Sequence, residues 1–103
     1  MNAVIVWPAD QDRVRPGRHL VSGWAWSASP VASVEVSTDG GASWHEAVVG
    51  PPASAQTWQR FEFSWDDAEP GTYEIRSRAT DVRGRVQPAA GRNSVHRVAV
   101  SVV

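Results

Sequence analysis

The sequence contains no cysteine and no lysine, and it has a single leucine, Leu20, among its 103 residues. Without cysteine the chain forms no disulfide, no thiolate metal site and no cysteine nucleophile. Amphipathic helices rely strongly on leucine, whereas the valines (16) and tryptophans (6) that are abundant here favour strands. These absences exclude an all-α fold and predict an all-β protein.

Long apolar runs and an excess of charge are also absent. No stretch reaches the length of a membrane span, and the first eight residues lack the basic segment and apolar core of a signal peptide. The net charge is −1, so no overall field favours nucleic acid or an anionic membrane. We expect residues 1–103 to form a single domain. A cytoplasmic and a periplasmic location both remain open.

Turn-forming residues divide the chain at regular intervals, which is typical of a β-sandwich. The alternation of apolar and polar residues predicts about seven strands, at residues 3–7, 19–27, 31–37, 43–49, 58–65, 72–80 and 95–103. In the last of these, Val98, Val100 and Val102 share one face. We therefore expect two sheets packed through their apolar faces.

The segment 20–27 departs from the pattern of a half-exposed strand. Leu20, Trp24 and Trp26 lie on one face, and neither face carries a charge. A sandwich strand normally turns one face to water, so something is expected to cover the outer face. A partner surface and an intramolecular cover, such as the loop at residues 50–55, are both open. Which of Trp24 and Trp26 faces the core is open as well.

Residues 37–44 (STDGGASW) fit the pattern S-x-D-x-G-x-x-W, which resembles the Asp-box hairpin of sialidases. The Asp39 carboxylate is expected to accept N–H groups of the turn, and Trp44 to pack over it. Gly40 and Gly41 permit the bend. We expect a structural turn without a catalytic role, because a sialidase propeller would repeat this motif in every blade of a much longer chain.

Other chemical motifs are weak. His19, His45 and His96 lack metal-ligand spacing, so we expect no metal site. No serine lies in a nucleophile elbow, and no glycine-rich phosphate loop is present. Arg97, on the outward face of the last strand, is by itself expected to be an ordinary surface residue.

Several segments together resemble the C-terminal dimerisation domain of the sulfite-oxidase-like molybdenum-cofactor (molybdopterin) oxidoreductases. In the family's order, they are GWAW at 23–26, VEVSTDGGASW at 34–44, RATD at 78–81, Gly84, Gln87-Pro88 and NSVHRV at 93–98. The resemblance implies an immunoglobulin-like (E-set) β-sandwich. It also implies a homodimer, with the strand of Leu20, Trp24 and Trp26 as the candidate interface.

The resemblance further implies that this domain accompanies a molybdopterin-binding catalytic domain of the same or a partner chain. The molybdopterin and its molybdenum would lie in that domain, so this chain is expected to bind no cofactor and to show no activity alone. By resemblance, Arg97 would lend its guanidinium to the oxyanion substrate pocket of the parent enzyme, since a planar fork suits two oxygens.

The alternative prediction is a free-standing immunoglobulin-like module that binds a protein or a carbohydrate. Its binding loops would be those at residues 50–55 and 81–91. The chain could thus be either a piece of a larger enzyme or an independent relative.

Overall fold

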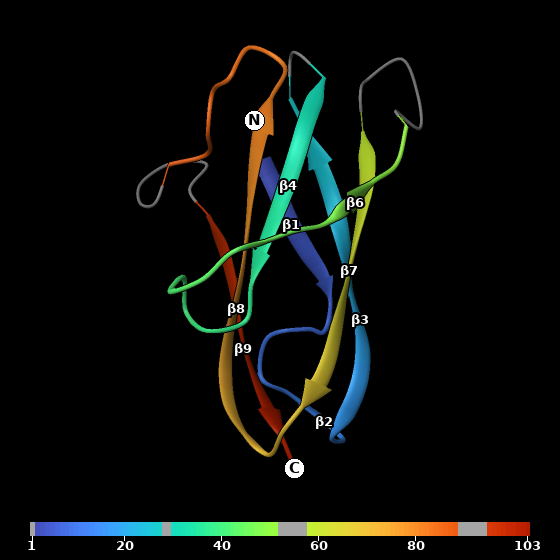
Figure 1. The fold of residues 1–103 in the computed structure, drawn as a ribbon, viewed down its shortest axis with the longest axis vertical. Coiled ribbons are helices and arrows are strands. Elements are labelled where there is room, and N and C mark those ends of the chain that lie inside the picture. Colours follow the sequence, from blue (N-terminus) through green and yellow to red (C-terminus); the bar gives the residue numbers. More distant parts are fainter. Residues whose placement is uncertain (1, 28–29, 52–57, 89–94) are drawn as a thin grey trace.

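Nine strands form the part of the chain described by the computed structural model, which comprises residues 2–27, 30–51, 58–88 and 95–103. In chain order (Figure 1) they are β1 (Asn2–Trp7), β2 (Asp12–Val14), β3 (Gly17–Trp26), β4 (Val31–Ser37), β5 (His45–Glu46), β6 (Val48–Val49), β7 (Gln59–Ala68), β8 (Gly71–Asp81) and β9 (His96–Val102). Within these residues there is no helix long and apolar enough to cross a membrane.

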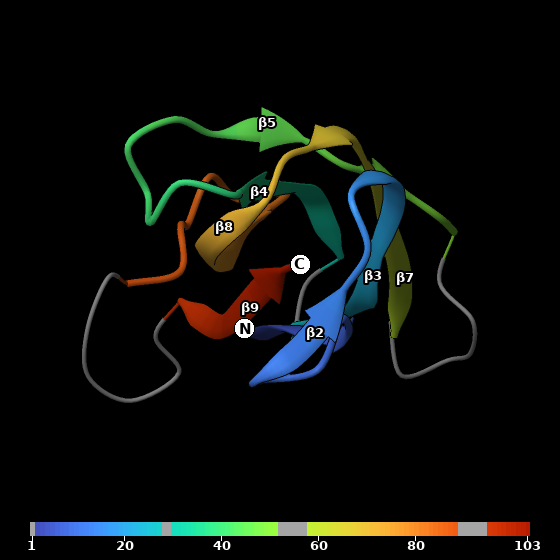
Figure 2. The same cartoon turned by 90° about the horizontal axis from the view of Figure 1, so that it is seen from below.

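The strands form two sheets that pack face to face. One has the order β1-β3-β7-β6 and the other the order β2-β9-β8-β4-β5. Neighbouring strands are antiparallel except β2 and β9, which are parallel. Figure 2 shows β3 and β7 in one layer and β4, β8 and β9 in the other.

The core lies between the two sheets and consists mainly of valine and alanine with a few larger side chains. The predicted inward rows of residues 72–80 and 95–103 are confirmed, because Ile75, Ala79 and Val98 are buried. Valine is the most frequent residue of this core, and the single leucine, Leu20, is exposed. The largest fully buried side chains include Phe61, Ile75, Val21, Val34 and Val36.

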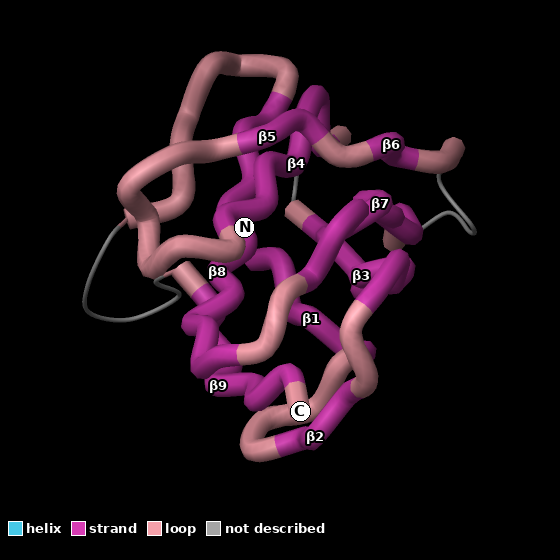
Figure 3. The backbone as a smooth tube through the Cα atoms, turned by 60° about the horizontal axis from the view of Figure 1, so that its bottom comes forward, coloured by secondary structure: helices cyan, strands magenta, loops and turns pink. Residues whose placement is uncertain are grey.

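The prediction of seven strands was wrong at two places. Strand β2 lies in what the sequence suggested was a polar loop, because it is only three residues long and gains its order by pairing with the distant β9. The expected strand at 43–49 is two short strands. Strand β5 pairs with β4 in one sheet, and β6 pairs with β7 in the other. Figure 3 shows this stretch passing from sheet to sheet.

Side-chain hydrogen bonds join the two sheets at both sides of the sandwich. On one side, the Ile5 N–H donates to His96 Nδ1 over 2.9 Å, so β9 is tied to the edge strand β1. On the other side, the buried Gln59 accepts the Val31 N–H over 2.9 Å and donates to the Gly50 carbonyl over 3.1 Å. These bonds satisfy backbone groups that would otherwise lie buried and unpaired.

Candidate functional site

The outward-facing side chains of β3 form the first candidate site. Val21 and Ala25 are fully buried and point into the core, whereas Trp24 and Trp26 are only half-buried. Leu20 is 48% exposed. Because side chains alternate along a strand, Leu20 and both tryptophans share the outer face of the sheet. Neither tryptophan belongs to the core.

The neighbouring strands extend this outer face. Trp24 lies opposite Val4 of β1 and Arg60 of β7 in the sheet register. Arg60 Nε forms an ion pair with Glu62 Oε1 at 3.1 Å, which neutralises the charge beside Trp24. Val48 of β6 pairs with Glu62 and is 76% exposed. The face is therefore largely apolar, with paired charges.

An open pocket of about 360 Å³ lies beside Trp24. Its lining consists of Trp24, Val48, Gly50, Pro51, Arg60 and Glu62. Gly50 and Pro51, in the segment after β6, thus lie beside Trp24 across an open hollow. Of the predicted loop 50–55, residues 52–55 lie outside the described residues. Leu20 is not among the residues that line this pocket.

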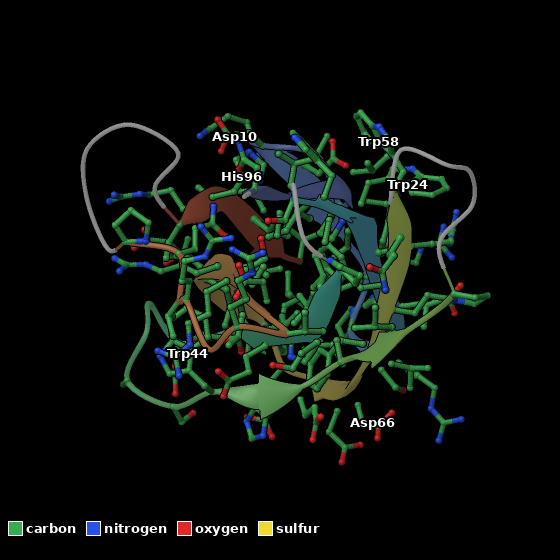
Figure 4. All side chains as sticks on the ribbon, turned by 90° about the horizontal axis from the view of Figure 1, so that it is seen from above. Asp10, Trp24, Trp44, Trp58, Asp66 and His96 are labelled. Atoms are coloured by element: carbon green, nitrogen blue, oxygen red, sulfur yellow. The ribbon has the colours of Figure 1, made fainter. Side chains whose placement is uncertain are left out.

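Trp58 completes this surface and was missed as a site residue in the sequence. Its ring stacks on that of Trp26, with centroids 4.5 Å apart and planes at 21°. Figure 4 shows Trp24 and Trp58 on the same side of the molecule, with Trp44 on the opposite side. The sequence did indicate this position, because Trp58 lies four residues before the outward Glu62, and residues separated by an even number lie on the same face of a strand.

The turn at residues 37–44 is a network of hydrogen bonds around Asp39. Asp39 Oδ1 accepts the Ser37 hydroxyl over 2.7 Å and the Ser43 N–H over 2.9 Å. Hydrogen bonds from the side chains of Ser43 and then Ser37 lower the pKa of Asp39 far below its usual value. Gly40 and Gly41 have φ angles of 72° and 95°, a region that favours glycine. These hydrogen bonds and the two glycines shape the loop between β4 and β5.

Trp44 lies under an arginine of the neighbouring strand. The Arg78 guanidinium carbon is 4.0 Å from the centre of the Trp44 ring, a cation–π distance. Arg78 Nε also donates to Glu35 Oε1 over 2.9 Å. The ring therefore fastens the loop to the outer face of the second sheet.

Arg97 lies on that same outer face, directly opposite Arg76 in the register of β8 and β9. Its side chain is 55% exposed, and its Nη1 is 3.9 Å from Glu74 Oε1. Since Leu20, Trp24 and Trp26 belong to the other sheet, the structure does not bring Arg97 and the candidate interface together. The two candidate sites occupy opposite outer faces of the sandwich.

The described residues offer no ligand set for a metal. Within residues 2–27, 30–51, 58–88 and 95–103, no three His, Asp or Glu side chains gather into a group that could hold a metal ion. His96 instead faces β1, where burial lowers its pKa and the nearby charge of Asp10 acts in the opposite direction. Figure 4 shows Asp10 and His96 close together.

The two packed sheets, with β1 in one and β2 paired to the last strand of the other, define an immunoglobulin-like β-sandwich. The sequence profile of the Mo-co oxidoreductase dimerisation domain matches residues 1–102. The chain belongs to this family, which confirms the resemblance drawn from its motifs.

Two curated relatives are sulfite oxidases. The chain is 35% identical over 95 residues to sulfite oxidase of Gallus gallus, a match that covers 85% of this chain and 20% of that protein. It is 31% identical over 120 residues to mitochondrial sulfite oxidase of Rattus norvegicus, covering 100% and 22% respectively. The chain therefore spans about a fifth of the length of these relatives.

Solved structures share the fold. The sulfane dehydrogenase SoxCD from Paracoccus pantotrophus superposes with a TM-score of 0.81 at 26% identity, covering 99% of this chain and 32% of that chain. The fibronectin(III)-like modules of CbhA from Clostridium thermocellum match with a TM-score of 0.71 at 20% identity, covering 97% and 93%. The second likeness concerns the fold alone.

Proposed function

We propose that this domain joins two copies of a sulfite-oxidase-like molybdenum-cofactor oxidoreductase through the outer face of the sheet β1-β3-β7-β6. The observation that carries the proposal is the uncharged outer row of β3 from Leu20 to Trp26. Leu20 is 48% exposed there and both tryptophans are half-buried. Tryptophans in a well-packed interface centre typically dominate the binding energy, and removing their apolar area from water favours association.

The charges on this face suit pairing with an identical copy. In a two-fold symmetric dimer each patch meets itself, so an excess charge of one sign would repel. Arg60 is paired with Glu62, and Arg18 Nε lies 3.0 Å from Asp66 Oδ1. Each positive charge thus has its own negative partner, and two copies of the face can meet without net repulsion.

The catalytic chemistry would belong to another domain of the full-length enzyme. Molybdenum centres of this type need a thiolate ligand by family resemblance, and the chain has no cysteine. The described residues also hold no cluster of metal ligands, so they do not fit a molybdenum site. We therefore assign molybdopterin to a separate catalytic domain and give residues 1–103 the role of one accessory domain without activity of its own. Arg97, on the opposite face, is the candidate to reach that domain's oxyanion substrate.

Light scattering behind size exclusion, over a wide dilution series, tests the dimer. We expect a mass of two chains that falls to one chain on dilution. Trp24→Arg should weaken the dimer about thirtyfold or more, since the loss at a hot-spot residue is at least about 2 kcal/mol. Val82→Arg is the matched control, because Val82 is 60% exposed but lies outside β3, in the segment after β8.

A monomer at every concentration contradicts the proposal, as does a Trp24→Arg dimer as tight as the control. Circular dichroism must show that each variant is folded. If Trp24→Arg loses the folded signal, Leu20→Arg replaces it, since the exposed Leu20 side chain can be exchanged without filling a buried space.

A further inference from the structure

We infer that Arg76 and Arg97 together form a binding site for a small, doubly charged oxyanion, and that Glu74 neutralises this site in the free domain. The inference rests on the role proposed above for Arg97. It adds a second arginine and an internal competitor, neither of which the sequence motifs indicated.

The register of β8 and β9 places two like charges side by side. Arg76 and Arg97 are direct partners across the two antiparallel strands, on the outer face of the sheet. Like charges directly opposite each other destabilise a strand pair. A pair of arginines at such a position is therefore costly unless an anion lies between them.

The Glu74 carboxylate is such an anion, but it lies closer to Arg76 than to Arg97. Its Oε1 lies 3.2 Å from both Nε and Nη2 of Arg76. The same oxygen is 3.9 Å from Arg97 Nη1, which is beyond hydrogen-bond length. Arg97 consequently keeps most of its five N–H donors available for another ligand.

The two guanidinium groups also differ in how firmly they are placed. The Arg76 side chain is 27% exposed and lies against the turn, where a Cβ added at Gly41 would come within 3.3 Å of its Nη1. The Arg97 side chain is 55% exposed. One arginine is thus held in position by the loop and by Glu74, and the other can approach a ligand from the open side.

The carboxylate position defines the ligand class. A single oxygen of Glu74 reaches the space between the two guanidinium groups, so that space accepts an anionic oxygen. A tetrahedral dianion has further oxygens that can accept hydrogen bonds from both guanidinium groups. Its two negative charges also balance the two positive charges of the arginines. A carboxylate carries one negative charge and can form a bidentate pair with only one guanidinium group.

The other outer face provides a matched control. Arg60 and Glu62 are spaced two residues apart on β7, as Glu74 and Arg76 are on β8, and their Nε–Oε1 distance is 3.1 Å. The register partner of Arg60 on β3 is Trp24. Removing the Glu62 charge therefore frees one arginine, whereas removing the Glu74 charge frees two adjacent ones.

The test is a sulfate titration at constant ionic strength, balanced with chloride and followed by the Nε–H NMR signals of the arginines. We expect Glu74→Gln to bind sulfate about two- to fivefold more tightly than the parent chain, which corresponds to the loss of one exposed ion pair. Glu62→Gln should bind sulfate as the parent does. Adding Arg76→Gln or Arg97→Gln to Glu74→Gln should abolish the gain.

Two results would overturn the inference. One is equal sulfate affinity in Glu74→Gln and Glu62→Gln, and the other is a gain that survives the loss of Arg76. A parallel titration with acetate distinguishes a site for a small inorganic oxyanion from a site for a carboxylate side chain. If acetate binds more tightly than sulfate, the arginines recognise a carboxylate side chain, and the oxyanion assignment fails. Light scattering on the same samples reports dimerisation independently.

Discussion

Gly23→Ala should strongly destabilise the domain, because the backbone of the paired strand β1 lies against the position that a side chain of residue 23 would take. A Cβ built at Gly23 would lie 1.9 Å from the carbonyl oxygen of Val4 and 2.6 Å from Cζ of Phe61. Real Cβ contacts stay above 3.0 Å, so the new methyl group is about 1.1 Å too close to backbone. Neither rotation of a side chain nor a change of rotamer at Phe61 relieves a contact with a carbonyl.

The expected loss of stability follows from this geometry. Overpacking a filled core costs about 1–3 kcal/mol, and the backbone clash places the loss for Gly23→Ala at the upper end, about 3 kcal/mol. For a domain of this size, that loss corresponds to a decrease in Tm of about 12–24 °C. Thermal unfolding followed by circular dichroism, with urea unfolding as a second measurement, gives the value.

Gly50→Ala, at the residue directly after β6, is the matched control. Its nearest non-neighbouring atom would be the Arg60 carbonyl oxygen at 3.5 Å, an ordinary contact. We expect its stability to stay within about 0.5 kcal/mol of the parent chain. If Gly23→Ala melts within a few degrees of Gly50→Ala, then β1 does not lie against β3 in the register described here.

Two further predictions concern the hydrogen bonds that join the sheets. Gln59→Leu leaves the buried Val31 N–H without an acceptor, and should cost about 2 kcal/mol in urea unfolding. The pKa of His96 is lowered by burial from 6.5, against the opposing charge of Asp10, so unfolding favours proton uptake. The stability this neutral ring contributes is complete above about pH 6.5 and is lost as the pH falls. Replacing it in His96→Gln, whose amide oxygen can still accept the Ile5 N–H, should flatten that dependence; an unchanged pH profile would refute the argument.

Much of the fold was predictable because it rests on local alternation. Ile75 and Val98 face the core, as the alternation of apolar and polar residues predicts. Each lies in a strand that is long enough for this alternation to be recognised in the sequence. Strand β2 and the division of residues 43–49 were not predictable in this way. Both depend on pairing with distant partners, which local patterns do not encode.

The candidate sites divide in the same manner. The outer row of β3 from Leu20 to Trp26 could be recognised from its lack of charge, and the structure places Trp24 and Trp26 together there. The neighbours that complete each site could not be recognised, since they are set by register. Trp58 reaches Trp26 only because β7 pairs with β3, and Arg76 meets Arg97 only because β8 pairs with β9.

The separation of the two sites by the thickness of the sandwich has a functional consequence. A dimer formed through the outer face of β3 leaves the Arg76–Arg97 face open, so one domain can hold a second copy and present guanidinium groups to another domain at once. Groups on opposite faces share no contacts, and their effects should add independently. Trp24→Ala, which removes the ring without placing a second arginine opposite Arg60, should therefore leave sulfate binding unchanged, and Glu74→Gln should leave the dimer unchanged. Coupling between the two measurements would mean that both variants act on a single surface, and the assignment of association to one sheet would have to be abandoned.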